Sequence, residues 1–258
     1  MDVPGISRPV LVVLIVTAIG LLATGGSWVL SWVTRSTETT TRTMLAASRI
    51  DIESHRSGDI QVVGTDRADI RLTTTEHRTL FGRPHSKVTF EDGRLRVDGH
   101  CSEFELSGSD AACSITYRLE VPRDTAVALQ ANASDVRVEH LAGTADVRTQ
   151  SGDLHASDIA GDLHATAISG DVHADSGGRV VDVSATSGDI HVHARNPMRV
   201  RANTVSGDVH VSVPDRAYAV RTHAGSGDEN VDVDRDERAA RTIEAGTTSG
   251  DLHVSPDG

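Results

Sequence analysis

Residues 151–155 read SGDLH, and close copies of this pentapeptide occur five more times along the chain. The copies are AGDLH at 160–164, SGDVH at 169–173, SGDIH at 187–191, SGDVH at 206–210 and SGDLH at 249–253. A motif that returns at a regular interval is the sequence signature of a repeat architecture, in which each copy belongs to one supersecondary unit. The fold therefore depends on what each letter of this motif does.

The spacing of the motif predicts the size of one structural turn. The motif aspartates, with a degenerate first member, are Asp135, Asp153, Asp171, Asp189, Asp208, Asp228 and Asp251, giving spacings of 18, 18, 18, 19, 20 and 23 residues. The added residues fall between the motifs, as insertions do in a solenoid. Each unit contains two short stretches with strand-like alternation. We therefore predict an all-β protein, a parallel β-helix or β-solenoid with about 18–20 residues per turn.

Strand periodicity predicts which residues of the motif face the core and which face solvent. Successive side chains of a strand point to opposite faces, so the apolar residue between Asp and His faces the core. These residues are Leu154, Leu163, Val172, Ile190, Val209 and Leu252. The aspartate before each of them and the histidine after it then face solvent.

The Ser-Gly-Asp part of the motif is interpreted as a corner. Glycine adopts positive φ without strain, and aspartate hydrogen-bonds nearby backbone N–H groups. The predicted corner residues are Gly152, Asp153, Gly170, Asp171, Gly188, Asp189, Gly207 and Asp208. An alternative is Ca²⁺ bound between stacked aspartates, but the G-G-x-G-x-D pattern of calcium-binding repeats is absent.

Of the residues in the repeated motif, the histidine is the one that the fold needs least. We expect His155, His173, His191, His210 and His253 to form a solvated stack whose charge changes near pH 6. The alternative is a transition-metal site from Asp189, His191 and His193 on one strand face, with His173 and His210 from adjacent turns. Alternate residues of a strand lie roughly 7 Å apart, which disfavours a shared metal. We therefore expect no cofactor.

The N-terminal part of the chain differs in composition from the rest. Residues 9–34 carry no charge and are long enough to cross a bilayer, with Trp28 and Trp32 near one end. The sequence predicts a cytoplasmic segment over 1–8, a transmembrane helix over 9–34 and a flexible, threonine-rich stalk over 35–48. A β-rich capping region over 49–132 and the repeat region over 133–258 would follow. A cleaved signal peptide is the alternative for the apolar segment.

Cysteine content and charge limit the compartment and the partners. Cys101 and Cys113 are the only cysteines, and their spacing suggests one disulfide in an oxidising compartment, although two reduced thiols remain an alternative. The net charge of −12 argues against nucleic acid as a partner. These features predict a single-pass membrane protein whose C-terminal domain is extracytoplasmic. The expected partners are the lipid bilayer, through 9–34, and an unidentified envelope or cell-surface component.

The repeat region also resembles a known family. Tyr117, Leu119, Val121 and Pro122 match its Y-x-(V/L)-x-V-P strand, and Ser151-Gly152-Asp153 and its successors match the repeated sGdv/l units that follow. On these residues the chain resembles the bacterial "putative adhesin" domain-of-unknown-function family, over roughly 49–255. The resemblance implies an extracytoplasmic β-solenoid and supplies no catalytic residues.

These features favour a non-enzymatic function. The sequence lacks G-x-S-x-G, H-E-x-x-H and phosphate-loop motifs, and its Ser, His and Asp residues recur equivalently on every turn. A catalytic group needs unique surroundings that tune its pKa. We therefore expect an acidic, histidine-bearing surface for adhesion, envelope scaffolding or sensing. A metal-binding surface protein and a polysaccharide-active β-helix enzyme are the two alternatives.

Overall fold

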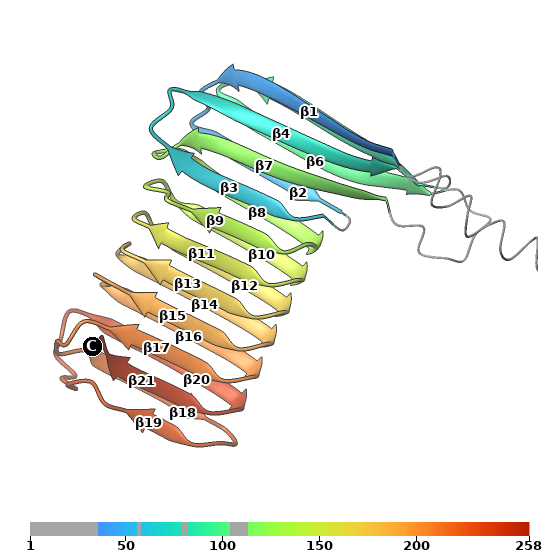
Figure 1. Ribbon diagram of the computed structural model, residues 1–258. Helices are drawn as coiled ribbons and strands as arrows, with labels where there is room; N and C mark the ends of the chain where they lie inside the picture. Colours follow the sequence, from blue (N-terminus) through green and yellow to red (C-terminus); the bar gives the residue numbers. More distant parts are fainter. Residues whose placement is uncertain (1–35, 56–57, 79–81, 104–112, 258) are drawn as a thin grey trace, which may run out of the picture.

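The computed structural model describes residues 36–55, 58–78, 82–103 and 113–257, which form two long β-sheets that face each other (Figure 1). In spatial order, sheet A consists of β1 (Ser36–Leu45), β4 (Asp69–Arg78), β7 (Ser114–Pro122), β3 (Ile60–Thr65), β9 (Val136–Glu139), β11 (Leu154–Ile159), β13 (Val172–Ser176), β15 (Ile190–Ala194), β17 (Val209–Val213), β21 (Leu252–Pro256) and β19 (Glu229–Val231). Sheet B follows the order β18 (Ala219–Ala224), β20 (Thr242–Ser249), β16 (Arg199–Ser206), β14 (Val180–Ser187), β12 (Leu163–Ser169), β10 (Ala145–Ser151), β8 (Ala126–Ala133), β2 (Arg49–Ser54), β6 (Arg94–Glu103) and β5 (Gly82–Glu91).

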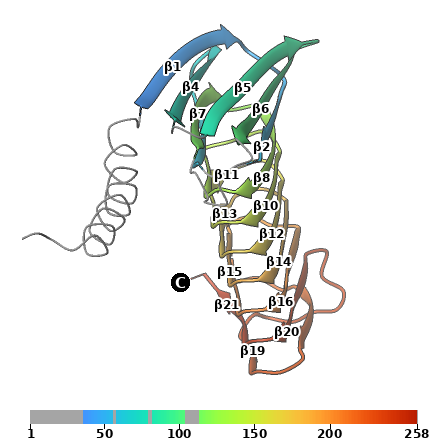
Figure 2. The same ribbon diagram turned by 90° about the vertical axis from the view of Figure 1, so that its right-hand side faces the viewer.

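The repeat region is a parallel solenoid, as predicted. From β8 to β17 the chain alternates between the two sheets, so each turn contributes one strand to each sheet (Figure 2). Val172 pairs with Leu154 on one side and with Ile190 on the other, both in parallel register. Equivalent aspartates on these turns are 18, 18 and 19 residues apart in sequence. The predicted all-β class and turn length are confirmed.

The core between the sheets is a column of small aliphatic side chains. All six motif residues predicted to face inward have at most 1% of their surface exposed: Leu154, Leu163, Val172, Ile190, Val209 and Leu252. Ala156, Val192, Val200 and Val211 are buried beside them, whereas Val220, also expected inside, is only partly buried. Removing this apolar surface from water is the main favourable term that holds the two sheets together.

The Ser-Gly-Asp corners bring successive turns into close contact. At Gly188 φ is 138°, a value that L side chains rarely adopt, and a Cβ there would overlap the carbonyl oxygen of Gly170 on the preceding turn. The Gly188 N–H donates to the carbonyl of Ser206 on the following turn, at 3.0 Å. The predicted corner glycines Gly152, Gly170 and Gly207 have the same positive φ and the same close approach to a neighbouring carbonyl.

The order of the last turns differs from the expected sequential stacking. After β17 the chain passes to β18 and β19 at the far end of the stack, and then returns so that β20 and β21 lie one turn further in. Val209 therefore pairs with Leu252, and Leu252 pairs with Glu229. The motif of β21 fits the ladder better than that of β19, because Leu252 is buried while Glu229 is exposed.

The predicted boundary at residue 133 is not a break in the sheets. Strand β3 pairs in parallel with β9 through Ile60 and Val136, and β2 pairs in parallel with β8 through Ile50 and Val127. Residues before 133 thus already form solenoid turns. The N-terminal end of the stack is then closed by antiparallel pairs, β4 with β7 and β5 with β6.

The prediction of a flexible stalk over 35–48 is wrong for residues 36–45. These residues form β1, which pairs antiparallel with β4 from Ser36–Arg78 to Leu45–Asp69. Its threonines are β-branched and favour the extended backbone. The sequence does not indicate this strand, because nearly every side chain is exposed and the segment lacks the apolar alternation by which strands are recognised.

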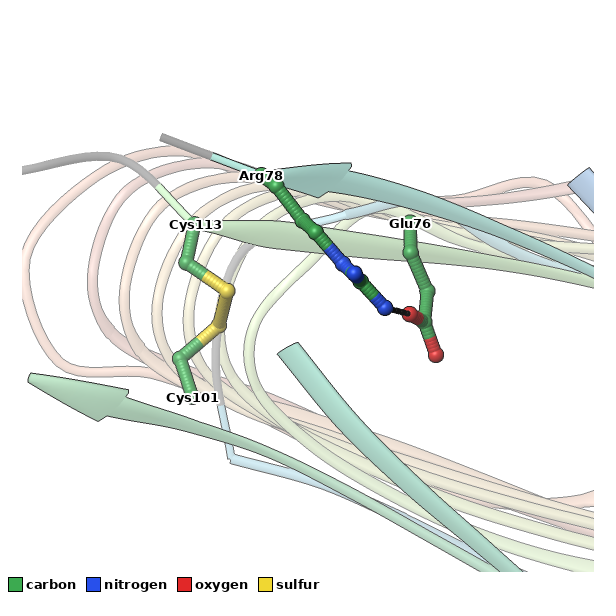
Figure 3. The surroundings of a disulfide bond; sticks show 4 residues. All are labelled: Glu76, Arg78, Cys101 and Cys113. Carbon is green, nitrogen blue, oxygen red and sulfur yellow. Dashed lines mark ion pairs between the residues drawn. A yellow bond between two sulfur atoms is a disulfide. The ribbon is translucent and has the colours of Figure 1, made fainter. Parts of the chain in front are cut away.

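The predicted disulfide between Cys101 and Cys113 is present (Figure 3). It joins β6 of sheet B to the residue before β7 of sheet A, with Cα atoms 6.0 Å apart. The Arg78–Glu76 ion pair of β4 lies nearby (Figure 3). The crosslink therefore ties the two sheets together near the N-terminal end of the stack.

Two tyrosines fill the core near the two ends of the solenoid. Tyr117 of β7 is fully buried and donates a hydrogen bond to Ser86 Oγ at 3.1 Å, and burial raises the pKa of its hydroxyl to about 12. Tyr218, just before β18, is also fully buried and donates to the carbonyl of Pro214 at 3.1 Å. Large aromatic side chains thus fill the core where the regular stacking of turns stops.

The predicted transmembrane helix over 9–34 lies outside the described residues. Among the residues that the structure describes, no helix is long and apolar enough to span a bilayer.

A glycine substitution tests the close packing of the corners. Gly188→Ala is expected to lower the free energy of unfolding by at least about 2 kcal/mol, because it combines an unfavourable φ with a backbone overlap. Gly177→Ala is the matched control, since the nearest atom to its new Cβ is 3.6 Å away. Urea denaturation should separate the two variants, and equal midpoints would contradict this account of the corner.

Candidate functional site

The outer face of sheet A carries a row of stacked histidines. This histidine row consists of His155, His173, His191, His210 and His253, one on each of β11, β13, β15, β17 and β21. The ring centroids of the first four are separated by 5.0, 4.8 and 5.1 Å, with interplanar angles of 24°, 26° and 23°. The fifth ring is 5.9 Å from the fourth and tilted by 55°. The predicted imidazole stack therefore forms, and it follows the spacing of the strands.

The histidine row belongs to a longer line of paired residues that crosses all eleven strands of sheet A. Cross-strand registers connect the following residues in order: Thr41, Thr73, Arg118, Gln61, Arg137, His155, His173, His191, His210, His253 and Asn230. On the nine strands from β4 to β21 in the sheet order, the residues before and after each member are buried, so these members lie on the outer face. The line thus combines two arginines and five histidines on a protein of net charge −12.

Two open hollows lie along this line. One, of about 390 Å³, is lined by Arg118, Arg137, Thr73 and His155 among others. There Arg118 donates to Gln61 Oε1 at 2.8 Å, and the Gln61 amide donates to Glu139 at 3.0 Å. The other hollow, of about 370 Å³, lies over the histidine row itself. The outer face therefore offers two contact positions along the line, one beside the two arginines and one over the histidines.

The motif aspartates form a second column beside the histidines, and they act through the backbone. The N–H of Asp171 donates to Oδ1 of Asp153, and the N–H of Asp189 donates to Oδ1 of Asp171. The same bond continues from Asp208 to Asp189 and from Asp251 to Asp208. Each carboxylate thus binds the corner of the following turn in the stack, which agrees with the interpretation of these residues as corner residues.

The pKa values of two histidines on β15 are shifted in opposite directions. Partial burial and the neighbouring His173 and His210 lower the pKa of His191, although Asp189 and Asp171 oppose this effect. His193 shares the same face, and its hydrogen bond to Asp257 raises its pKa. The predicted metal candidates Asp189, His191 and His193 are therefore adjacent, but they have different partners.

The structure also contains a chain of ion pairs that the sequence did not reveal. His140 Nδ1 lies 3.0 Å from Asp158, which accepts from Arg195 at 2.8 Å. Arg195 also contacts Asp175 at 3.1 Å, and His193 lies between Asp175 at 3.6 Å and Asp257 at 2.8 Å. We call these six residues the ion-pair chain. His140 and Asp158 are one turn apart, as are Asp175 and His193, but the residue types at these positions change from turn to turn, so no repeated motif indicates them.

The outer face of sheet B has a different character. His164 of β12 pairs with Asp146 on one side and Asp182 on the other. Arg201 then binds Glu244 at 3.0 Å and approaches Asp182 to 3.8 Å. On this line Arg201 thus lies between two carboxylates of opposite charge. The histidine row and the two arginines therefore distinguish the outer face of sheet A from that of sheet B.

The geometry of the histidine row bears on metal binding. Stacked rings about 5 Å apart do not direct two nitrogens at a common point about 2 Å from each. Within the part of the chain that the structure describes, no three His, Cys, Asp or Glu side chains gather as a metal site.

The opposite pKa shifts of His191 and His193 predict opposite pH dependence of stability. His191 has a lowered folded-state pKa, so its protonation below about pH 6.5 favours the unfolded chain. His193 has a raised folded-state pKa, so its stabilisation is complete at low pH and is lost as the pH rises through that value. His193→Gln should therefore destabilise the protein more at about pH 5.5 than at about pH 8.

His191→Gln is expected to show the reverse order when the same denaturation curves are measured. Equal pH dependence in both variants would contradict the assigned partners.

Comparison with known proteins places the chain in a family. Structures with a similar fold include a "putative cell adhesion protein" from Clostridium sporogenes ATCC 15579, at 12% identity and a TM-score of 0.42, covering 86% of this chain and all of that one. A "putative lipid binding protein" from Parabacteroides distasonis ATCC 8503 matches at 15% identity and a TM-score of 0.44, covering 86% and 97%.

A "putative adhesin" from Bacteroides fragilis NCTC 9343 matches at 12% identity and a TM-score of 0.34, with the same coverage of 86% and 97%. No curated protein matches the sequence. The sequence profile described as Toastrack DUF4097 matches residues 117–179 and 175–255, which together are more than half of the chain. The protein therefore belongs to the Toastrack DUF4097 family.

Proposed function

We propose that the protein is a non-enzymatic adhesin, anchored in the cell membrane by residues 9–34, that presents the outer face of sheet A to an envelope component. The observation that carries this proposal is the line of paired residues that runs in register across all eleven strands. A rigid row of equally spaced groups suits repeated contact with an extended partner, because many weak contacts add through multivalency.

The repetition of the row also supports a binding function over catalysis. The four rings from His155 to His210 have nearly the same spacing and tilt relative to their neighbours. Catalysis requires one group whose pKa is set apart by its surroundings. A row of similar groups provides repeated contact points and no single reactive centre.

The compartment is inferred from the disulfide and from the uncharged N-terminal segment. The Cys101–Cys113 bond is of the kind that persists outside the reducing cytoplasm. Residues 9–34 are long enough and apolar enough to cross a bilayer. Both features support an anchor followed by an extracytoplasmic domain.

Accessibility in intact cells tests the proposed location. In cells producing the full chain with a C-terminal tag, the two cysteines should resist alkylation until a reductant is added, and external protease should remove the tag. Cys113→Ser is the control, because it leaves Cys101 free for alkylation without reduction. Alkylation of the natural chain without reductant, together with protection from protease, would refute an extracytoplasmic domain.

The role of the row is tested by comparing the two faces. The full chain, immobilised, should retain isolated cell-envelope fragments, and the triple variant His173→Gln, His191→Gln, His210→Gln should retain about tenfold less, equivalent to about 1.4 kcal/mol. The control is His164→Gln with His223→Gln, two matched changes on sheet B. Equal retention by all three proteins, or an equal loss in both variants, would argue against binding through sheet A.

A further inference from the structure

Among the residues that the structure describes, strand β1 forms an exposed sheet edge with a neighbouring strand on one side alone. It forms one end of sheet A, and within the described ranges its pairing partner is β4 (Figures 1 and 2). Every residue from Ser36 to Thr43 is exposed, Leu45 is 78% exposed, and only Met44 packs against the core. No described strand pairs with the backbone N–H and C=O groups along the outer side of β1, which are the groups that a further strand would bind.

The other three sheet edges are protected in recognisable ways. Strand β5 contains Pro84 and Lys87, which oppose the addition of a strand. Strand β19 has three residues, which is too short to guide a partner. At the start of β18 the free edge is covered by residues 234–236, because the Tyr218 N–H donates to the Asp234 carbonyl and the Asp236 N–H donates to the Tyr218 carbonyl. Strand β1, with the sequence STETTTRTML, has ten residues and contains no Pro, Gly or Lys.

We propose that β1 pairs antiparallel with β1 of a second copy of this chain, about a two-fold axis that passes midway between the two Thr40 residues. Such an axis is perpendicular to the sheet, so it keeps equivalent faces together and permits only registers that pair residues of the same parity. Centred on Thr40, the register places Ser36 opposite Met44, Thr37 opposite Thr43, Glu38 opposite Arg42 and Thr39 opposite Thr41.

The charges of β1 select this register. Arg42 forms no ion pair with any residue that the structure describes. Arg78 is the ion-pair partner of both Glu38, at 3.4 Å, and Glu76, at 3.5 Å, so two carboxylates share one guanidinium. A second copy would bring its Arg42 opposite Glu38, twice by symmetry. Shifting the register to centre on Glu38 or on Arg42 would instead place like charges opposite each other.

The threonines provide the remaining complementarity. Between β1 and β4 the hydroxyls of Thr39 and Thr75, and of Thr41 and Thr73, already pair at 3.3 Å across the strands. The proposed dimer would repeat this arrangement on the other side of β1, with Thr39 facing Thr41 of the second copy. Since β1 supplies both halves of each contact, a second copy fits this edge through residues already present in the strand.

A single cysteine on the proposed axis tests the dimer directly. In the antiparallel register, the two Cα atoms at position 40 would lie about 4.5–5.5 Å apart, within the range that a disulfide spans. Thr40→Cys in the membrane-inserted full chain should therefore form a covalent dimer under mild oxidation, visible on a non-reducing gel. Thr43→Cys is the control, because its symmetry mate would lie about 20 Å away.

Charge exchange tests the register independently of the cysteines. In the Thr40→Cys background, Glu38→Arg should reduce the yield of the covalent dimer severalfold, because it places two arginines opposite each other. Adding Arg42→Glu should restore the yield, since the pair is then reversed and complementary. The natural Cys101–Cys113 disulfide serves as the check that each variant has folded.

Three outcomes would overturn the proposal. The first is equal crosslinking of Thr40→Cys and Thr43→Cys. The second is an absence of dimer in Thr40→Cys while the natural disulfide is intact. The third is a crosslinked product whose mass shows a different protein, which would identify β1 as the docking edge for another partner.

Discussion

The structure depends on the close stacking of one corner upon the next. At the Ser-Gly-Asp corners inside the stack the glycine N–H donates to a serine carbonyl of the adjacent turn, and the aspartate carboxylate accepts the N–H of the equivalent aspartate. These bonds leave no room for a Cβ at the glycine, as Gly188 illustrates. Because one corner fixes the height and rotation of the next, the aliphatic core, the aspartate column and the histidine row follow in register.

The sequence predicts the parts of the fold that repeat and misses the parts that do not. The spacing of the motif aspartates and the alternation around Leu154 were sufficient for the turn length and the core face. The exchange of the last two turns was missed because β19 carries the same Gly-Asp corner as β21, and only Glu229 in place of an aliphatic residue marks it as terminal. Strand β1 was missed because backbone pairing, and not burial, holds it in place.

The candidate site was likewise predictable from the sequence where it repeats and not where it does not. The histidine row could be predicted because it is one column of the repeat, and its stacking follows from the strand spacing. Its extension through Arg137, Gln61 and Arg118 could not, since these residues come from strands whose spatial order differs from their order in the chain. The ion-pair chain was also hidden, because Arg195 and Asp257 lie just beyond the ends of β15 and β21, outside the repeated pentapeptide.

The position of the C-terminal strands sets the order in which the molecule can be assembled. Within the described part of the chain, the sheet neighbours of β18 and β19 are β20 and β21, which are synthesised after them. During synthesis or export, which proceed from the N-terminus, the solenoid can extend turn by turn as far as β17. Its far end must then wait for the final residues of the chain. A protein interrupted before Leu252 would expose an unfinished sheet edge, which marks incomplete molecules for degradation or aggregation.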